Sequence, residues 1–247
     1  MLDTSLISSF DRIYSTDLVY EHDCWQLCGN GHCCNYTRYK SQFTMLGHQH
    51  YQELPLLPGE HDYWAHKGWL NRFGEFEHRV IPYPLSSGTM QIEFLVGRSK
   101  SCACEHATRT TICRLYPLLP VYDVPGNLIG VDTGFGIFEE IEDLDHLPRA
   151  CRIASIPFAE LGKFLAIALE IGHNPKAVFY TMAYRLAKLH ARRRLEQLRG
   201  GRSVSALAVL ERAFLIRQLL DQSVLRPELD ALAGRFREHY GSRFVLD

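Results

Sequence analysis

Residues 174–201, NPKAVFYTMAYRLAKLHARRRLEQLRGG, predict a long helix with a defined start and end. Asn174 is a typical N-cap residue, and Pro175 suits the first helical position, where a backbone N–H has no intrahelical partner. Apolar residues recur at helical spacing as far as about Leu198. The pair Gly200-Gly201 then ends the helix.

Similar signals predict three more helices around this one. Residues 156–171 are apolar at helical spacing, with Pro157 near the start. Ser203 or Ser205 caps a third helix that reaches about Gln222, and Pro227 opens a fourth that Gly241 stops. Four helices in about 90 residues favour an antiparallel bundle.

The sequence changes character near residue 155, because all eight cysteines lie before it. Residues 89–96 (TMQIEFLV) and 128–131 predict strands. The first 23 residues hold a short helix or a strand, and residues 51–85 show no sustained period. We therefore predict an α+β fold that is mainly α. An irregular cysteine-rich metal-binding module with a small sheet (1–155) would be followed by a helical region packed on it (156–247), as two units or as one domain.

Composition limits the class of protein. The 247 residues are 46% hydrophobic and 22% charged, with a formal net charge of −1. This balance is ordinary for a globular protein and argues against a dedicated nucleic-acid coat or a membrane-surface protein. The first residues do not resemble a secretory signal, and no apolar run is long enough to span a bilayer. We expect a cytoplasmic protein, in which cysteines serve as metal ligands more often than in disulfides.

Four cysteines fall within eleven residues: Cys24, Cys28, Cys33 and Cys34. Thiolates are soft ligands that suit zinc and iron–sulfur clusters. Glycines between them allow the tight turns that wrap a loop around a metal. A lone cysteine such as Cys151 is usually a buried apolar residue, but that reading fits four clustered cysteines poorly.

A second group consists of Cys102, Cys104 and Cys113. A fold that brought it to the first group would form one site from two distant segments. The side chains of Cys33 and Cys34 diverge because the residues are adjacent, so one of them would bind a different metal or none. Spacing alone fits both iron and zinc, and the seven cysteines are candidate ligands for either.

The pattern Cys-x3-Cys-x4-Cys-Cys, followed by Cys-x8-Cys and Arg-Leu-Tyr-Pro, resembles the YkgJ-type cysteine-cluster family of zinc- or iron-chelating domains. The resemblance covers about residues 20–135. Cys104 and Cys113 match the family's middle pair, and Tyr116-Pro117 matches its aromatic-proline step. The residue before Pro117 is not the usual arginine, and no cysteine follows closely, so Cys102 would supply the missing thiol.

Three functions follow from these signals. The first is an iron–sulfur protein in redox or modification chemistry. The family includes enzymes similar to flagellin lysine methylase, so the resemblance implies an iron–sulfur cofactor, with S-adenosylmethionine as co-substrate if the chain is methylase-like. An oxidoreductase and a methylase-like transferase both stay open. The second is structural zinc in a module that binds an unidentified partner. The third is a protein that transfers iron or zinc.

Histidines and aromatic residues are dense between residues 48 and 78. His48 and His50 would share one side of a strand, and imidazole suits zinc and iron. The others are His61, His66 and His78, while His32 lies inside the first cysteine group. Hydrogen-bonded or solvated histidines are the more common case. The aromatic residues Tyr51, Tyr63, Trp64 and Trp69 favour a core or a pocket wall.

The stretch that begins at Arg185 and ends at Arg202 holds seven Lys or Arg residues and one acid. On a helix these side chains can form a positive face for phosphate or nucleic acid, although a solvated face is more common. The interleaved leucines, including Leu189 and Leu195, fit a core stripe. The acidic run at 139–145 favours a solvated surface.

Overall fold

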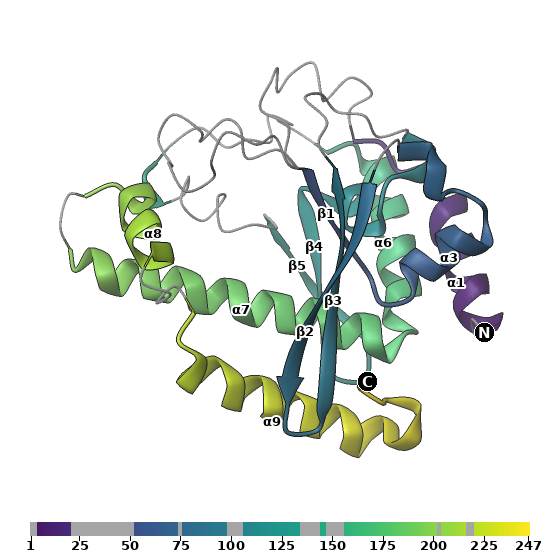
Figure 1. Ribbon diagram of the computed structural model, residues 1–247. Coiled ribbons are helices and arrows are strands. Elements are labelled where there is room, and N and C mark those ends of the chain that lie inside the picture. The colour runs from purple at the N-terminus through teal and green to yellow at the C-terminus, as the bar shows by residue number, and fades with distance from the viewer. Residues whose placement is uncertain are drawn as a thin grey trace.

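The computed structural model describes residues 4–20, 52–73, 76–97, 106–133, 144–146, 156–201, 204–215 and 220–247. Helices make up 58% of these residues, and the strands form two small antiparallel sheets. The predicted α+β fold with C-terminal helices is therefore confirmed (Figure 1).

The long helix predicted from residues 174–201 is α7 (Pro175–Arg199). The Asn174 side chain accepts hydrogen bonds from the backbone N–H groups of Lys176 and Ala177, as an N-cap should. At the other end, Gly200 adopts a left-handed conformation with φ 59°, which favours glycine. α7 packs against the helices α6 (Phe158–Gly172), α8 (Ala206–Leu215) and α9 (Gln222–Tyr240), and against one strand of the second sheet.

The start of the fourth helix differs from its prediction. α9 begins at Gln222, where the Asp221 side chain accepts a hydrogen bond from the Ser223 N–H, and Pro227 lies inside it. The cap at Asp221 and the burial of Leu225 outweigh the constraint of one proline in the second turn. Gln222 is therefore the first residue of α9, not the end of the third predicted helix. That third helix is α8, which reaches Leu215 in the described residues.

The larger sheet has the strand order β1-β3-β2, with β1 (Gln52–Leu56), β2 (Phe76–Leu85) and β3 (Gly88–Gly97). The central strand β3 confirms the strand predicted at 89–96. Sequence reasoning missed β2 because Pro82 and Pro84 interrupt it. As an edge strand, β2 tolerates residues that lack an N–H.

The smaller sheet pairs β4 (Leu118–Tyr122) with β5 (Leu128–Thr133). β5 confirms the strand predicted from Leu128, whereas β4, which contains Pro120, was missed. The turn between the strands approaches the end of α6 closely. A side chain at Gly126 would place its Cβ 2.2 Å from the carbonyl oxygen of Gly172, so glycine is required there.

Five further helical elements precede α6 in the described part of the chain. They are α1 (Thr4–Ser15), α3 (Glu60–His66) and α4 (Thr111–Leu115), with the 3-10 turns η3 (Leu70–Phe73) and η4 (His106–Thr108). A further 3-10 turn, η5 (Gly241–Arg243), follows α9. The weak signal in the first 23 residues thus corresponds to a helix.

One hydrophobic core joins the two predicted parts. It contains Phe10, Trp64 and Leu95 from the first part together with Phe164 and Phe236 from the second. The prediction that Tyr63 and Trp64 belong to a core is confirmed. No helix in the described ranges is both long and apolar enough to cross a membrane.

The β2–β3 hairpin is tied to α9 by polar contacts. Asp230 Oδ1 accepts hydrogen bonds from the Ser86 backbone N–H at 2.6 Å and from its hydroxyl at 2.9 Å. Arg226 donates to the Pro84 carbonyl at 2.7 Å. Because of these contacts, the sheet and the C-terminal helices form one packed unit (Figure 1).

The core predicts how α9 responds to truncation. Phe236 is fully buried, and its ring lies 5.4 Å from that of Phe179 and 5.1 Å from that of Phe244. Phe236→Ala should lower the free energy of unfolding by about 3–5 kcal/mol. Val224→Ala, on an exposed position of the same helix, should change it by less than about 0.5 kcal/mol. Urea denaturation measures both, and equal effects would contradict this packing.

Candidate functional site

Cys113 is the one predicted metal ligand within the described residues. It lies half-buried on α4, and its thiol forms no disulfide there. The Thr110 side chain caps this helix by accepting a hydrogen bond from the Cys113 backbone N–H at 3.3 Å. The cap fixes the backbone that carries the thiol.

Arg114, the next residue, fastens α4 to its surroundings. It is buried, and its guanidinium donates to the Thr16 carbonyl at 3.0 Å and to the Arg109 carbonyl at 3.2 Å. The same group lies 4.6 Å from the centre of the Tyr14 ring, a cation–π distance. A buried cation that is satisfied by carbonyls and an aromatic face holds its neighbours in a single arrangement.

Glu60 joins three helices through one buried carboxylate. Its Oε1 accepts hydrogen bonds from the Tyr14 hydroxyl, the Thr111 hydroxyl and the Thr111 N–H, each at 2.6 Å. Its Oε2 accepts from the Leu57 N–H at 2.8 Å. These donors come from α1, α4 and the turn before α3, so the carboxylate is the common contact of the elements around Cys113.

Burial and hydrogen bonding act on the pKa of Glu60 in opposite directions. The side chain has no solvent exposure, and burial raises its pKa above the ordinary value of 4.5. The donated hydrogen bonds of Thr111, Tyr14 and Leu57 lower it, but burial has the larger effect.

The chain before the first cysteine group runs along α4. The Tyr20 hydroxyl donates to the Leu115 carbonyl at 3.2 Å, and Arg109 donates to the Leu18 carbonyl at 3.1 Å. In the larger sheet, Gln52 at the start of β1 pairs with Gly97 at the end of β3. The described residues that flank the two cysteine groups are therefore adjacent in space.

The other six predicted ligands lie outside the described residues. They are Cys24, Cys28, Cys33, Cys34, Cys102 and Cys104. Within the described ranges, no group of three or more His, Cys, Asp or Glu side chains could hold a metal ion. The seven-cysteine site thus stays a prediction.

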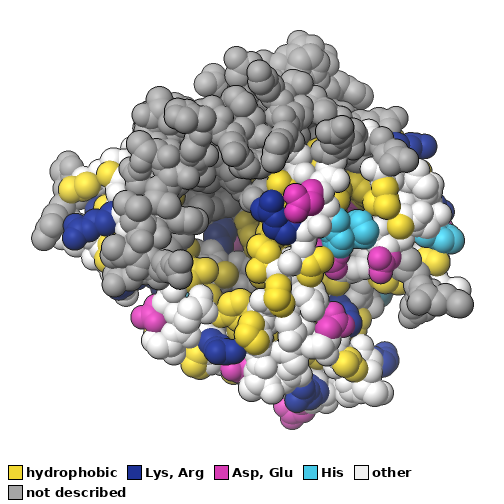
Figure 2. All heavy atoms as spheres, viewed as in Figure 1, with side chains coloured by type: hydrophobic (Ala, Val, Ile, Leu, Met, Phe, Trp, Pro, Cys, Tyr) yellow, Lys and Arg dark blue, Asp and Glu magenta, His cyan; other side chains and the backbone are white. Residues whose placement is uncertain are grey.

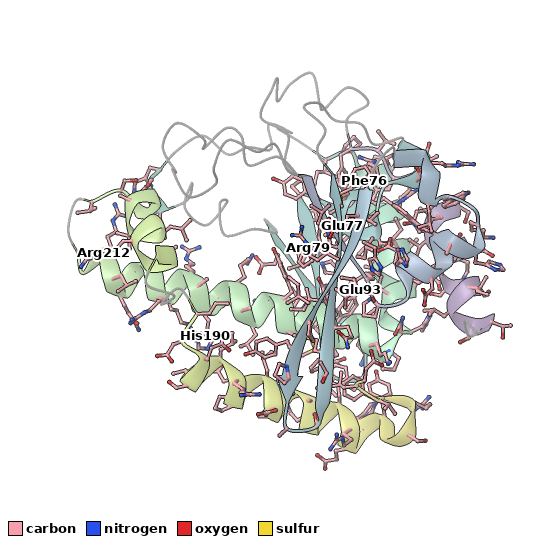
Figure 3. The ribbon with its side chains drawn as sticks, in the orientation of Figure 1. Phe76, Glu77, Arg79, Glu93, His190 and Arg212 are labelled. Carbon is pink, nitrogen blue, oxygen red and sulfur yellow. The ribbon has the colours of Figure 1, made fainter. Side chains whose placement is uncertain are left out.

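Two of the candidate histidines are brought together. The rings of His61 and His78 stack with centroids 3.6 Å apart, and His78 Nε2 lies 3.0 Å from Glu93 Oε2. Figure 2 shows histidine side chains gathered on one face beside acidic groups, and Figure 3 labels Glu93. Burial lowers the pKa of both rings, and for His61 the neighbouring His78 adds to the effect. His66 is exposed and does not join the pair.

Three cations of the basic stretch on α7 lie beside acidic side chains of the chain itself. Arg185 Nε lies 3.1 Å from Asp132 Oδ2, and the buried Lys188 Nζ lies 3.7 Å from the same oxygen. Further along, Arg192 Nε lies 3.2 Å from Glu196 Oε1. Leu195 is buried, as the predicted core stripe requires. A nucleic-acid interface at this stretch stays a prediction.

A cleft of about 610 Å³ lies between α1, β3 and the start of α7. Met90 and Phe179 provide apolar walls, and Glu93 and Tyr180 provide polar groups. Tyr180 is 6% exposed, and burial raises its pKa.

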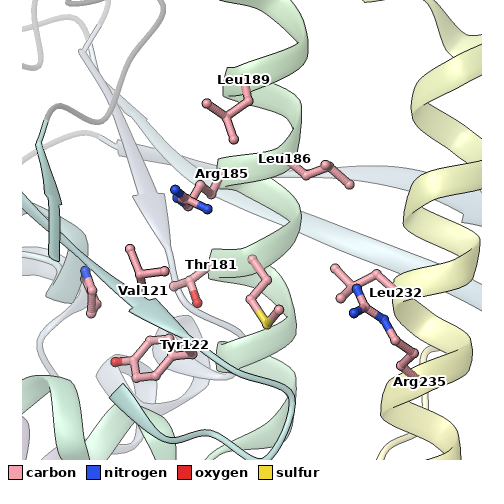
Figure 4. Close-up of a pocket in the computed structure, with 10 residues that line it drawn as sticks. Val121, Tyr122, Thr181, Arg185, Leu186, Leu189, Leu232 and Arg235 are labelled. Carbon is pink, nitrogen blue, oxygen red and sulfur yellow. The ribbon is translucent and has the colours of Figure 1, made fainter. Parts of the chain in front are cut away.

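A smaller cavity of about 150 Å³ lies between β4, α7 and α9 (Figure 4). Leu186, Leu189 and Leu232 make it mainly apolar, with Arg185 and Arg235 at its edges. Its volume is below the range of about 300–1,000 Å³ that is typical of ligand sites, whereas the larger cleft falls inside that range.

Sequence reasoning missed Glu60 and Tyr14. Each is a single polar residue without a motif around it, and no spacing in the sequence connects them. Comparison with known proteins adds no assignment, because no protein-family profile, no curated protein and no solved structure matches the chain.

Glu60→Gln tests the carboxylate as the contact between the helices. An amide offers one acceptor oxygen, so its NH₂ group would face either Thr111 or the Leu57 N–H. We expect the free energy of unfolding to fall by about 1–3 kcal/mol, because a buried donor loses its partner. The exposed Glu238→Gln is the matched control and should leave chemical denaturation unchanged.

The raised pKa of Glu60 predicts a pH dependence of stability. Below pH 4.5 the carboxyl is protonated in both the folded and the unfolded chain. Above that value the unfolded chain ionises first, so folding loses free energy as pH rises until the folded pKa is passed. Relative to Glu60→Gln, the wild-type protein should therefore lose stability as pH rises above about 4.5. A wild-type protein that gains stability relative to the variant in this range would contradict the direction.

Proposed function

We propose that this protein binds a metal through its two cysteine groups, and that the metal is an iron–sulfur cluster. The single observation that carries the proposal is the packing of residues 16–20 along α4, where Tyr20 bonds to the Leu115 carbonyl. Cys24 follows Tyr20 by four residues, and Cys113 precedes Leu115 by two. Both groups are thereby tethered to one place.

Covalent geometry gives the reach of this tether. Four residues extend at most about 14 Å, so Cys24 lies within that distance of the Tyr20 backbone. Cys104 is two residues from His106, where η4 begins, and Cys102 follows Gly97 by five residues. Thiols from both groups can therefore meet near α4 without any change in the described fold.

The anchors around α4 are suited to hold a ligand. The Thr110 cap, the Arg114 carbonyl contacts and the Glu60 carboxylate fix the helix from three sides. A metal site gains affinity when its ligands are held in place before the metal binds. In the proposed site Cys113 is the fixed ligand, and the remaining cysteines close around the metal.

For the reaction, we propose only its chemical class. A cluster held by thiolates would supply electron transfer or modification chemistry, as an oxidoreductase or as a methylase-like transferase. Zinc in the same ligands would instead make the site a structural clasp for a binding module. An exchangeable metal would point to a carrier of iron or zinc.

Cysteine variants test the shared site. Protein purified without oxygen should contain iron and acid-labile sulfide and absorb visible light. Cys24→Ser and Cys113→Ser should each lose most of the metal, because one ligand comes from each group. Cys151→Ser, outside both groups, is the control and should retain it.

The same measurements separate the alternatives. Stoichiometric zinc with unfolding on chelation would favour the structural clasp, and rapid exchange with free metal would favour a carrier. A colourless protein without iron or zinc would contradict the iron–sulfur cluster, the structural zinc site and the metal carrier alike. Loss of metal in Cys24→Ser alone would contradict a site shared with α4.

A second candidate function is small-molecule binding in the 610 Å³ cleft. The observation that favours it is the lining, in which Asp62, Glu93 and Tyr180 offer polar groups beside the apolar side chains of Met90 and Phe179. Small-molecule sites commonly combine apolar walls with a few polar groups that fix the orientation of the ligand. S-adenosylmethionine is the first ligand to test, since the cleft offers carboxylates and apolar walls.

Calorimetric titration with S-adenosylmethionine checks this second candidate. Tyr180→Phe should weaken binding by about three- to tenfold, the effect of one hydrogen bond. Tyr83→Phe is the matched control, because Tyr83 bonds to Gln222 outside the cleft. No binding to the wild-type protein, or equal binding by both variants, would contradict the assignment.

A further inference from the structure

The imidazole rings of His61 and His78 are stacked where α3 meets β2. Their centroids are 3.6 Å apart, and the ring planes differ by 8°. His61 belongs to the first turn of α3, and His78 belongs to the first part of the edge strand β2. The side chains are 22% and 27% exposed, so the rings shield each other from much of the solvent. We call this contact the histidine pair.

The carboxylate of Glu93 on β3 connects the histidine pair to the central strand. Its Oε2 lies 3.0 Å from His78 Nε2, and it accepts a hydrogen bond from the N–H of Gly59, which precedes α3. In the register of the two strands, Val80 lies opposite Glu93 and His78 lies opposite Leu95. His78 and Glu93 therefore share one face of the sheet. The pair and this carboxylate join three elements in one polar cluster.

Two further carboxylates lie near this cluster. Asp62, the next residue on α3, has its Oδ1 3.7 Å from His61 Nδ1. Asp247 interacts electrostatically with Glu93, and its Oδ1 lies 3.5 Å from Lys176 Nζ at the start of α7. Asp62 is therefore the second counter-charge of the histidine pair, after Glu93, whereas Asp247 already lies beside a cation.

The other titratable groups around the cluster do not neutralise a charged histidine. Tyr180 on α7 interacts electrostatically with Glu93, but burial raises its pKa and keeps its hydroxyl protonated. Along β2, Glu77 and Arg79 alternate with His78, so their side chains point to the opposite face of the sheet.

Burial and mutual repulsion keep both rings of the histidine pair neutral at neutral pH. Burial is the largest effect, and it lowers the pKa of His61 and of His78 below the ordinary value of 6.5. His78 lowers the pKa of His61 further. Asp62 raises the pKa of both rings and Glu93 raises that of His61, but burial outweighs them. Two neutral rings can stack at this distance, whereas two imidazolium rings would repel each other.

We propose that the histidine pair is a pH-sensitive latch, which holds α3 against β2 at neutral pH and releases this contact in mild acid. Released rings are solvated and bind protons more readily than stacked rings do. Falling pH therefore favours the released arrangement, and this preference begins as the pH drops below 6.5.

The position of the latch couples it to the 610 Å³ cleft. Gly59, Asp62 and Glu93 all line that cleft, so release of the contact would move one of its walls. Tyr63 and Trp64 are buried in the core on the same helix, so α3 stays folded while its contact with β2 opens. The latch depends neither on the proposed metal nor on a bound ligand.

Hydrogen exchange of the backbone amides in α3 and in the first part of β2 tests the latch on the full chain. Between about pH 7.5 and about pH 5.5, the wild-type exchange rates, corrected for the intrinsic effect of pH, should rise about threefold or more. The double variant His61→Phe with His78→Phe keeps two stacked rings but cannot titrate, so its corrected rates should not rise. His66→Phe, at an exposed position of the same helix, is the matched control and should behave like the wild type.

Proton NMR of the histidine rings is a second test that does not need the double variant. In the wild-type protein His61 and His78 should titrate below pH 6.5, and His78→Phe should raise the pKa of His61, because a repelling neighbour is removed. Titration of either ring at or above 6.5 would overturn the latch, as would wild-type exchange rates that acid leaves unchanged. A rise that the double variant retains, or that His66→Phe removes, would also overturn it.

Discussion

The buried carboxylate of Glu60 is the contact on which the arrangement around α4 depends. It has no solvent exposure, and it receives hydrogen bonds from Tyr14, Thr111 and Leu57. Each donor belongs to a different element, so none of the three elements can move without breaking a charged or buried hydrogen bond. A buried donor or acceptor without a partner lowers the free energy of unfolding, so these hydrogen bonds favour the observed arrangement of the three elements over others.

This arrangement determines where the cysteine-bearing segments begin and end. Arg114 holds the chain at Thr16, and Tyr20 holds it at Leu115, so the residues before the first cysteine group follow α4. The end of β3 and the start of β1 meet at the pair Gln52 and Gly97. The described fold thus anchors the segments that carry the two cysteine groups, and the proposed metal would link these two groups.

Sequence patterns predicted the helical half of the fold well, because its signals are local. Asn174 and Gly200 mark the ends of α7 through their own backbone preferences. Pro227 misled the prediction, since the Asp221 cap six residues earlier decides where α9 starts. Strand β2 was missed because its prolines are acceptable only at a sheet edge, and edge position depends on tertiary structure.

The candidate site was predicted by a different kind of signal. Clustered cysteines indicate metal chemistry directly from residue type, whereas Glu60 and Tyr14 have a role only because the fold brings them together. Of the predicted ligands, Cys113 alone falls within the described residues, so the metal site stays a proposal. The central claim is that one metal centre takes thiolates from both groups.

X-ray absorption at the metal edge, on protein purified without oxygen, tests that claim most directly. The account predicts a first shell of sulfur ligands together with iron–iron scattering from a cluster. A mononuclear zinc site with four sulfur ligands at about 2.3 Å would agree with a site shared by both cysteine groups. It would contradict the iron–sulfur cluster and indicate a structural role for the metal. A first shell of nitrogen and oxygen, or no bound metal, would contradict the account.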